Sequence, residues 1–214
     1  MENWFFDFTP EKLAQCAKRN KDPHGLFAAL EAVLPRYEIN TVDRVAAFLA
    51  QCGHESADFT VLQENLNYSS KGLVATWPKR FLSEAAAAPY NRNPEAIANK
   101  VYGGRLGNNK VTDGWTFRGR GYIQLTGRAN YAEIDKLVPE DLLENPDLVA
   151  GKYAMLSAGY YWNSRKINAV ADKGATKEVV ELVTLKVNGG TNGLEERTKY
   201  FFEYHKILTA TPIV

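Results

Sequence analysis

Cysteine and histidine are scarce in this 214-residue chain, which has two cysteines and three histidines. Two cysteines cannot form the disulfide framework that supports small secreted domains. Cys16 and Cys52 fall within helical patterns, so we interpret them as small buried apolar residues. With histidine only at positions 24, 54 and 205, a zinc site built on several imidazoles is barely possible. The sequence therefore predicts a chain that folds in a reducing compartment without a disulfide, a metal or a cofactor.

Long hydrophobic runs are also absent. No stretch approaches the roughly 18 consecutive apolar residues of a membrane span. The N-terminal segment MENWFFDFTPEK lacks a basic region followed by an apolar core, so we predict no signal peptide. We find no internal repeat, low-complexity tract or linker. The sequence predicts a single domain over residues 1–214, in which helices of about residues 1–40 pack on a core of about residues 41–208.

Net charge is small, but it is unevenly distributed. The whole chain carries +1, whereas the segment from Lys71 to Arg128 has ten Lys or Arg and three acidic residues, a local +7. The rest of the chain carries the compensating excess of acidic residues. Either these cations are scattered and solvated, or they form a basic surface that faces an anionic polymer.

Proline and capping residues mark most of the predicted helices. A capping residue followed by proline begins helices at Thr9-Pro10, Asp22-Pro23, Asn93-Pro94 and Asn145-Pro146. We expect the first to run to about Arg19, the second to end at Pro35, and the last to be a long core helix that includes DLVAGKYAMLSAGYYW. Further helices are predicted from about 42 to 55, from Thr176 to about Val187, and from Leu194 to about Leu208.

Strand signals are few. Residues 59–66 and 115–125 are the two segments that could pair as a small β element. The sequence therefore predicts a mainly α fold with a small β element.

Glu55 lies at the end of the predicted helix from Val42, in the segment CGHES. Helical spacing places it beside the apolar stripe that contains Phe48 and Cys52. A carboxyl group there is partly desolvated, which favours its neutral form and suits a general acid. The alternative is a structural glutamate whose charge an arginine or the backbone satisfies. We assign no chemistry to His54.

Glu64 follows nine residues later and is the candidate for a second carboxyl group. Continued helix would carry it about 13 Å along the axis, but Asp58, Phe59 and Thr60 interrupt the pattern. The chain can therefore turn back and present Glu64 across a groove. A separation of about 6.5–9.5 Å between two carboxyl groups suits glycoside hydrolysis with inversion. Asp58 competes as second carboxylate, but we expect it to lie too close to Glu55 and to turn the chain.

The segment FRGRGYIQLTGRANY, residues 117–131, combines glycines with polar and aromatic side chains that could bind a sugar. Gln124, Thr126 and Asn130 supply neutral donors and acceptors, and Thr126 could hold the water that Glu64 deprotonates. Tyr122, Tyr131 and Trp115 supply aromatic faces. A glycine-rich turn before a helix is the alternative interpretation.

These motifs together resemble glycoside hydrolase family 19, the chitinase-like enzymes of the lysozyme superfamily. GRGYIQLTGRANY is similar to the family signature, AAFLAQCGHES to the segment with the general acid, and ENLNYSS with TWPKRF to the phage-lysin branch. The resemblance covers about residues 45–202 and implies a lysozyme-like, two-lobed α-helical domain with a small β element beside the catalytic cleft.

The resemblance also implies roles for individual residues. It gives Glu55 as general acid, Glu64 as second catalytic carboxylate and Thr126 as the residue that helps to hold the water. Gln124 and Asn130 correspond to sugar-binding amides, Asn188 of VNGG to a substrate-binding asparagine, and Arg197 to an arginine near the cleft. Three departures from plant chitinases, namely the short interval between the glutamates, threonine at 126 and the missing cysteines, favour a bacteriophage or prophage endolysin.

The expected activity is therefore that of a muramidase. Chitin is neutral whereas peptidoglycan carries carboxylates, so the local positive charge favours peptidoglycan glycan strands as partner. We expect inverting hydrolysis of the β-1,4 bond between N-acetylmuramic acid and N-acetylglucosamine, with chitinase activity as the alternative. As a lysin, the protein would remain in the host cytoplasm until a holin releases it. We expect a monomer that binds no nucleic acid.

Three other functions are weighed against this one. A zinc amidase is disfavoured because no histidine lies four residues after His54. A lytic transglycosylase would need only the acid, and a wall-binding module would need neither carboxylate.

The C-terminal stretch GLEERTKYFFEYHKIL could insert into a membrane, but its mixed charge and apolar stripe favour core packing.

Overall fold

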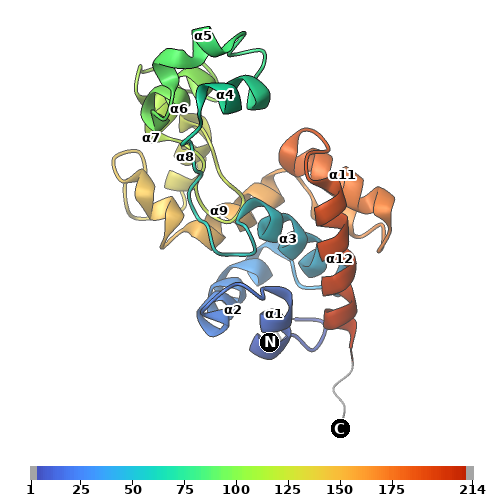
Figure 1. Cartoon of the computed structure of the whole chain (residues 1–214). Helices are drawn as coiled ribbons and strands as arrows, with labels where there is room; N and C mark the ends of the chain where they lie inside the picture. Colours follow the sequence, from blue (N-terminus) through green and yellow to red (C-terminus); the bar gives the residue numbers. More distant parts are fainter. Residues whose placement is uncertain (1–3, 211–214) are drawn as a thin grey trace. The chain divides into compact units, whose positions relative to one another are not determined.

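The computed structural model describes residues 4–210, and within this range the chain is helical (Figure 1). The α-helices are α1 (Pro10–Cys16), α2 (Pro23–Val33), α3 (Val42–Glu55), α4 (Ser70–Thr76), α5 (Glu84–Ala87), α6 (Pro94–Tyr102), α7 (Asp113–Thr116), α8 (Arg128–Asp135), α9 (Ala154–Ser164), α10 (Asn168–Ala171), α11 (Lys177–Asn188) and α12 (Leu194–Thr209). Three 3-10 helices accompany them: η1 (Leu34–Tyr37), η2 (Ala88–Tyr90) and η3 (Pro146–Ala150). We expected no signal peptide in the N-terminal segment, and residues 1–3 of that segment lie outside the described range.

The chain forms two compact units. Unit 1 contains residues 1–62, 121–123 and 151–214, and unit 2 contains residues 63–120 and 124–150. Each unit has a hydrophobic core of its own.

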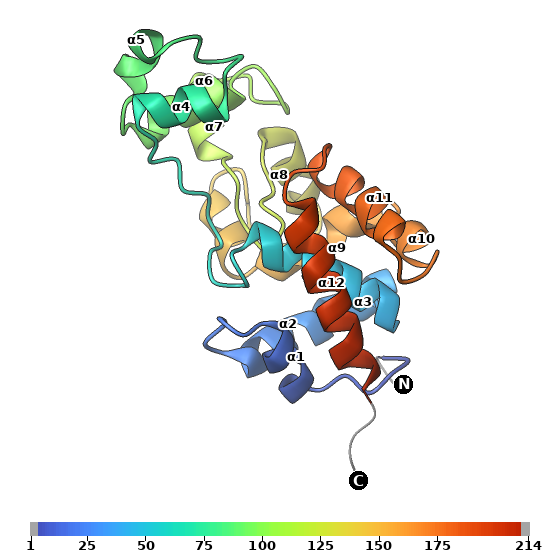
Figure 2. The same cartoon turned by 45° about the vertical axis from the view of Figure 1, so that its right-hand side comes forward.

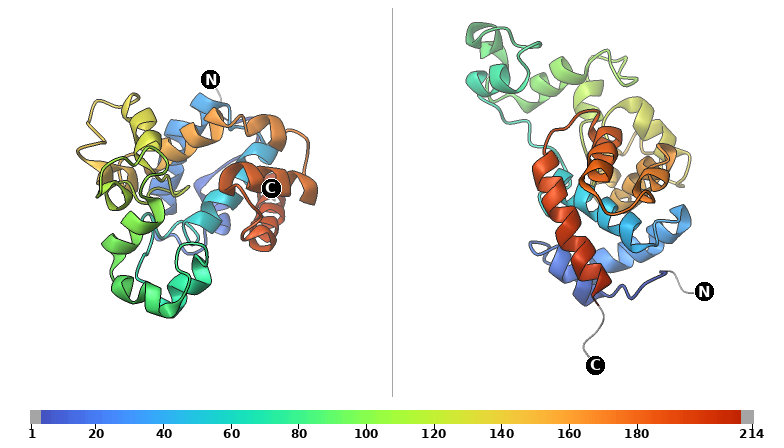
Figure 3. Two further views of the ribbon diagram at one scale, coloured as in Figure 1. Left: turned by 90° about the horizontal axis from the view of Figure 1, so that it is seen from above. Right: turned by 90° about the vertical axis from the view of Figure 1, so that its right-hand side faces the viewer.

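Unit 1 is organised around α3 and α12. These helices pack along one another in Figures 1 and 2, and Figure 3 shows the same pair from two further sides. The predicted apolar stripe of α3 faces the core, since Val45, Phe48, Leu49 and Cys52 are fully buried. Phe201 and Tyr204 of α12 are also buried, which confirms that the C-terminal stretch packs in the core. No helix in residues 4–210 is long and apolar enough to cross a membrane.

Four helix starts are confirmed by side-chain caps. Thr9, Asp22, Asn93 and Thr176 each accept a hydrogen bond from a backbone N–H three residues ahead. Each cap satisfies one of the donors that the first turn of a helix leaves without a partner. The helix predicted from about 42 also begins and ends as expected, at Val42 and Glu55.

Two predicted helices are shorter than expected. The first ends at Cys16 rather than near Arg19. The helix expected from Pro146 is instead a short 3-10 helix, and α9 starts only at Ala154. Gly151 lies in the intervening turn, where its carbonyl accepts the N–H of Ala154 at 3.1 Å. Glycine is a poor helix former, so the apolar pattern on both sides did not produce one continuous helix.

The predicted small β element is wrong for the described residues. Residues 59–66 and 115–125 form turns, loops and part of α7. Only two isolated antiparallel bridges occur in these segments, one between Gln63 and Arg120 and one between Arg120 and Leu125. The β-branched and aromatic residues that suggested strands are used for packing, since Phe59, Phe117 and Ile123 are buried.

Unit 2 contains α4 to α8, of which α4 to α7 are drawn together in Figure 2. Its small core is formed by apolar residues of α4, α5 and α6 and of the adjoining loops: Leu66, Leu73, Phe81, Ala87, Ile97, Ala98 and Val101. The start of α6 was predicted from Asn93-Pro94, whereas the short helices α4, α5, α7 and α8 were not predicted. Helices of four to eight residues carry too few turns to show an apolar periodicity.

Candidate active site

Glu55 is the last residue of α3 and belongs to unit 1. Its side chain is 18% exposed, so it is partly withdrawn from water as predicted. It also forms an ion pair, because Nη2 of Arg197 donates to its Oε1 at 2.6 Å. The arginine partner of the alternative interpretation is therefore present, and it is the same arginine that the family resemblance placed near the cleft. The ion pair fixes the direction of the carboxyl group.

Arg197 is fully buried on α12 and uses its guanidinium group in three directions. Besides Glu55, Nη1 donates to Oε1 of Gln51 at 2.6 Å and Nε donates to the carbonyl of Asn192 at 3.1 Å. Nε2 of Gln51 donates to Oγ1 of Thr184 at 3.1 Å, and Thr184 donates to the carbonyl of Val180. A buried charge is stable only when its hydrogen-bonding groups are satisfied. This chain of contacts therefore fixes the guanidinium group of Arg197, which in turn fixes the carboxyl group of Glu55.

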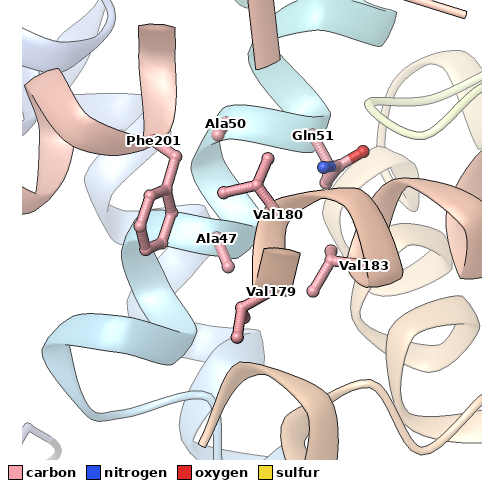
Figure 4. Close-up of a pocket in the computed structure, with 7 residues that line it drawn as sticks. All are labelled: Ala47, Ala50, Gln51, Val179, Val180, Val183 and Phe201. Carbon is pink, nitrogen blue, oxygen red and sulfur yellow. The ribbon is translucent and has the colours of Figure 1, made fainter. Parts of the chain in front are cut away.

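Gln51 and Thr184 were not identified from the sequence. Gln51 lies four residues before Glu55, hence on the same face of α3, and is 1% exposed. Figure 4 shows Gln51 beside Val180 and Val183 of α11, at the edge of an apolar contact whose internal space is too small for water. Water cannot replace the hydrogen bonds of Gln51 on that side. A glutamine in the apolar stripe, one turn before a glutamate, was the available signal.

The chain turns sharply after Glu55. Ala57, Asp58 and Phe59 are consecutive non-glycine residues with φ of 51°, 60° and 60°, in the left-handed region. Such residues are strained and persist only where surrounding contacts hold them. Asp58 accepts the N–H of Arg19 at 2.8 Å, and the carbonyl of Phe59 accepts Nδ2 of Asn20 at 2.9 Å. As expected, Asp58 turns the chain, and because it is buried we do not assign it catalytic work.

Glu64 belongs to unit 2 and is held by two donors. The N–H of Gly119 donates to Oε1 at 2.6 Å, and the hydroxyl of Tyr102 donates to Oε2 at 2.8 Å. Burial raises the pKa of Glu64, and these two hydrogen bonds oppose that effect only in part. Burial and the nearby Glu64 also raise the pKa of Tyr102, so its hydroxyl remains a donor. The sequence did not predict this burial of Glu64.

Gly119 approaches Glu64 so closely that a larger residue would disturb it. A Cβ atom at this position would lie 3.0 Å from Oε1 of Gln124 and 3.3 Å from Oε1 of Glu64. Tyr102 and the backbone of Gly119 were not identified from the sequence as partners of Glu64. Gly119 lies within the GRG motif, whereas nothing in the sequence around Tyr102 signals its contact.

Thr126, Gln124 and Asn130 lie in the loop and first turn that lead into α8. The hydroxyl of Thr126 donates to the carbonyl of Gln124 at 2.9 Å, and Nδ2 of Asn130 donates to the carbonyl of Thr126 at 2.7 Å. Gln124 has a φ of 53°, which turns the chain there. The structure therefore brings these three predicted residues together in unit 2. Of the three, Gln124 has its side-chain oxygen near Gly119, where the carboxyl group of Glu64 also lies.

Tyr131 and Arg120 form a buried support for the same loop. The hydroxyl of Tyr131 donates to the carbonyl of Arg118 at 2.7 Å and accepts from Nη1 of Arg120 at 3.0 Å. Arg120 also pairs with Asp147 at 2.7 Å. Because Tyr131 is 0% exposed, its ring offers no face to a sugar, and the residue supports the loop instead of stacking on substrate as predicted.

The remaining predicted residues are more accessible. Tyr122 is half-buried in unit 1, with its ring 5.8 Å from that of Phe59. Asn188 is exposed at the end of α11, one turn after Thr184. Trp115 in unit 2 carries the guanidinium of Arg118 over its ring at 3.7 Å.

His54 lies beside Glu55 in sequence but takes part in a separate surface contact. Its Nδ1 lies 2.5 Å from Oε2 of Glu196, and its ring packs against Gly193. Among residues 4–210, no three His, Cys, Asp or Glu side chains cluster as they would around a metal ion.

Comparison with known proteins supports a relationship to glycosidases. The profile described as chitinase class I, of glycoside hydrolase family 19, matches residues 37–181. A Haemophilus influenzae protein described as containing a glycosyl hydrolase family 19 domain is 41% identical over 189 residues, which are 84% of this chain and 88% of that protein. An Arabidopsis thaliana endochitinase is 28% identical over 218 residues, 97% of this chain but only 64% of the endochitinase.

Two solved structures share the fold. A bacterial family 19 chitinase has a TM-score of 0.60 at 23% identity, with 95% of this chain and 96% of that chain covered. Chitinase C from Streptomyces griseus HUT6037 has a TM-score of 0.61 at 21% identity, with 95% and 93% covered. The fold is therefore that of family 19 glycosidases. In the part of the chain that the structure describes, it consists of helices joined by loops.

Proposed function

Because this chain belongs to glycoside hydrolase family 19, we propose that it hydrolyses β-1,4 bonds in a polymer of N-acetylated hexosamines by an inverting mechanism. The observation that carries the proposal is a pair of carboxyl groups, each fixed by named donors. Arg197 holds Glu55, whereas Gly119 and Tyr102 hold Glu64. Glycoside hydrolysis requires two such groups with different tasks.

In the proposed mechanism Glu64 is the general base. Its pKa is raised by burial, which makes its ionised form a stronger base. The hydroxyl of Thr126 already donates its hydrogen to the carbonyl of Gln124, so its oxygen is available as an acceptor. A water that donates one hydrogen to Thr126 and the other to Glu64 would direct its lone pair to the anomeric carbon.

Glu55 is the proposed general acid. It would give its proton to the glycosidic oxygen as the bond to the anomeric carbon breaks, while water attacks from the opposite face. Arg197 and Gln51 would keep the carboxyl group aimed at that oxygen. Gln124, Asn130, Asn188 and Tyr122 are proposed to bind the sugars on either side, and Tyr131 to support the loop that carries Thr126.

Two polymers fit this chemistry. The relatives described as endochitinases favour chitin, a neutral polymer of N-acetylglucosamine. The excess of cations between Lys71 and Arg128 favours peptidoglycan, whose peptide stems carry carboxylates. In the second case the protein would be a muramidase of the lysin type, and its holin-dependent release from a host cytoplasm stays a prediction from resemblance.

The test is product analysis on both polymers. Purified protein is incubated with N-acetylchitohexaose and with purified sacculi, and the products are identified by mass spectrometry. N-acetylmuramic acid at the new reducing end indicates a muramidase, and N-acetylglucosamine there indicates a glucosaminidase. An anhydro sugar indicates a transglycosylase, and released peptides indicate an amidase. NMR of the first products should show the α-anomer at the new reducing end. Absence of glycosidic cleavage in both polymers would contradict the proposed function.

A further inference from the structure

Unit 2 contains an open pocket that none of the catalytic residues lines. Its volume is about 580 Å³, and it lies between the end of α4 and the loop that follows α6. The residues that line it are Thr76, Trp77, Pro78, Lys79, Arg80 and Arg105. Three of the six are cationic, and none is acidic.

The cations of this pocket differ from two other cations of the same unit, which are ion-paired. Arg120 is paired with Asp147, and Arg128 with Asp113. Lys79, Arg80 and Arg105 are exposed and have no ion-pair partner among residues 4–210. The excess positive charge seen in the sequence is therefore not neutralised at this pocket.

Trp77 gives the pocket a fixed aromatic wall. Its ring meets that of Tyr68 edge-on at 5.0 Å and lies 6.5 Å from that of Phe81. Trp77 is half-buried, so part of its surface remains accessible. Aromatic faces pack against sugar rings, and lysine and arginine bind carboxylates by charge-assisted hydrogen bonds. An aromatic wall beside three unpaired cations is suited to a sugar with an acidic substituent.

The pocket is close to the proposed base along the chain. Arg105 follows Tyr102 by three residues, which span at most about 10 Å, and Tyr102 donates to Glu64. The charge of Arg105 acts on Tyr102. A polymer positioned at Glu64 would therefore bring neighbouring sugars within reach of the pocket.

We propose that Trp77, Lys79, Arg80 and Arg105 form a binding site for a carboxylate-bearing sugar of the substrate, such as N-acetylmuramic acid with its peptide stem. The sugar ring lies against Trp77, and the lysine and the arginines bind the carboxylates. This inference rests on the proposed glycosidase function and identifies the residues that select an anionic polymer over a neutral one.

The test compares two triple variants of equal charge change. The pocket variant is Lys79→Gln with Arg80→Gln and Arg105→Gln, and the control is Lys71→Gln with Lys100→Gln and Lys110→Gln, which are exposed cations of unit 2 outside the pocket. At low salt the pocket variant should lose about tenfold in kcat/KM on soluble peptidoglycan fragments, since exposed ion pairs are individually weak. It should keep its kcat/KM on N-acetylchitohexaose. The control should keep most of its activity on both.

Trp77→Ala gives a second, independent readout. Because ring packing does not depend on charge, this variant should lose activity on both substrates, mainly through KM. Equal losses in the pocket variant and the control on peptidoglycan would overturn the inference and indicate general electrostatic attraction. A loss on the neutral oligosaccharide equal to that on peptidoglycan would overturn it as well.

A binding experiment separates failure of this inference from failure of the proposed function. If the protein cleaves neither polymer, the proposed function fails, but binding of N-acetylmuramoyl dipeptide to Glu64→Gln can still be followed by NMR. Titration should shift the indole N–H signal of Trp77, and the pocket substitutions should remove that shift. Inorganic phosphate at equal ionic strength should not reproduce it. No shift with the dipeptide, or the same shift with phosphate, overturns the carboxylate site.

Discussion

Gly119 and Glu64 exchange two hydrogen bonds. The N–H of Gly119 donates to Oε1 of Glu64 at 2.6 Å, and the N–H of Glu64 donates to the carbonyl of Gly119 at 3.0 Å. The backbone of one loop thereby fixes both the main chain and the carboxyl group of the proposed base. The absence of a side chain at Gly119 is what permits the approach.

Gly119→Ala should therefore reduce activity more than stability. The added Cβ would displace the carboxyl group of Glu64 or the amide of Gln124, and small misplacements of reacting groups can lower rates by about 100-fold. We expect kcat to fall about 10- to 100-fold, measured on whichever polymer is cleaved. Gly151→Ala is the matched control, because no atom lies within 4 Å of a Cβ there. Equal activity in the two variants would contradict the proposed position of Glu64.

The two glutamates should respond differently to the leaving group. Both Glu55→Gln and Glu64→Gln should lower polymer hydrolysis by about 100- to 10,000-fold, as expected for loss of a general acid or base. Dinitrophenolate departs from a sugar without being protonated. A dinitrophenyl chitooligosaccharide used as substrate should therefore restore much of the rate in Glu55→Gln. It should not do so in Glu64→Gln. The opposite pattern would exchange the two roles.

Activity should rise with pH through the pKa of Glu64, since a base must be ionised. Burial raises that pKa, so the acidic limb of kcat/KM should lie above the range of an exposed glutamate. Tyr102→Phe removes a hydrogen bond that favours the carboxylate, and the limb should move to still higher pH. Tyr90→Phe in the same unit is the control. A shift to lower pH in Tyr102→Phe would contradict the assignment of Glu64 as base.

Glu64→Gln should stabilise the protein at neutral pH. A carboxyl group whose folded-state pKa is raised contributes stability below its unfolded-state pKa and loses that contribution as the pH rises through the folded-state pKa. Glutamine keeps an acceptor for Gly119 and carries no charge. Thermal unfolding should show a higher Tm than wild type at pH 7 and little difference at pH 3. A lower Tm at pH 7 would mean that the ionised carboxylate stabilises the fold.

Gln51→Leu should weaken both the fold and the site. Arg197 would lose a buried acceptor, and an unsatisfied buried donor costs about 1–3 kcal/mol in free energy of unfolding. Denaturant unfolding of Gln51→Leu, Thr184→Val and the double variant measures the coupling of the two residues. Because both belong to one chain of contacts, the double variant should lose less than the sum of the single losses. Strict additivity would contradict the network.

Much of unit 1 could be predicted from the sequence because its signals are local. A capping side chain bonds to the N–H groups of the next turn, so Thr9, Asp22 and Thr176 mark helix starts without any knowledge of the fold. Apolar spacing in α3 likewise predicts which face is buried. The two segments expected as strands were wrong, because β-branched and aromatic residues favour any half-buried position and strands need partners that the local sequence does not specify.

For the site, the sequence alone determined which residues to consider. The types and order of Glu55, Glu64, Gln124, Thr126 and Asn130 already indicated a glycosidase, and family membership confirms that class. The roles of the individual residues stay predictions. Only the tertiary structure decided the environment of each carboxyl group. Arg197 is 142 positions from Glu55, and Gly119 is 55 positions from Glu64. Burial and hydrogen bonding depend on such distant contacts. The local sequence therefore could not predict that burial raises the pKa of Glu64.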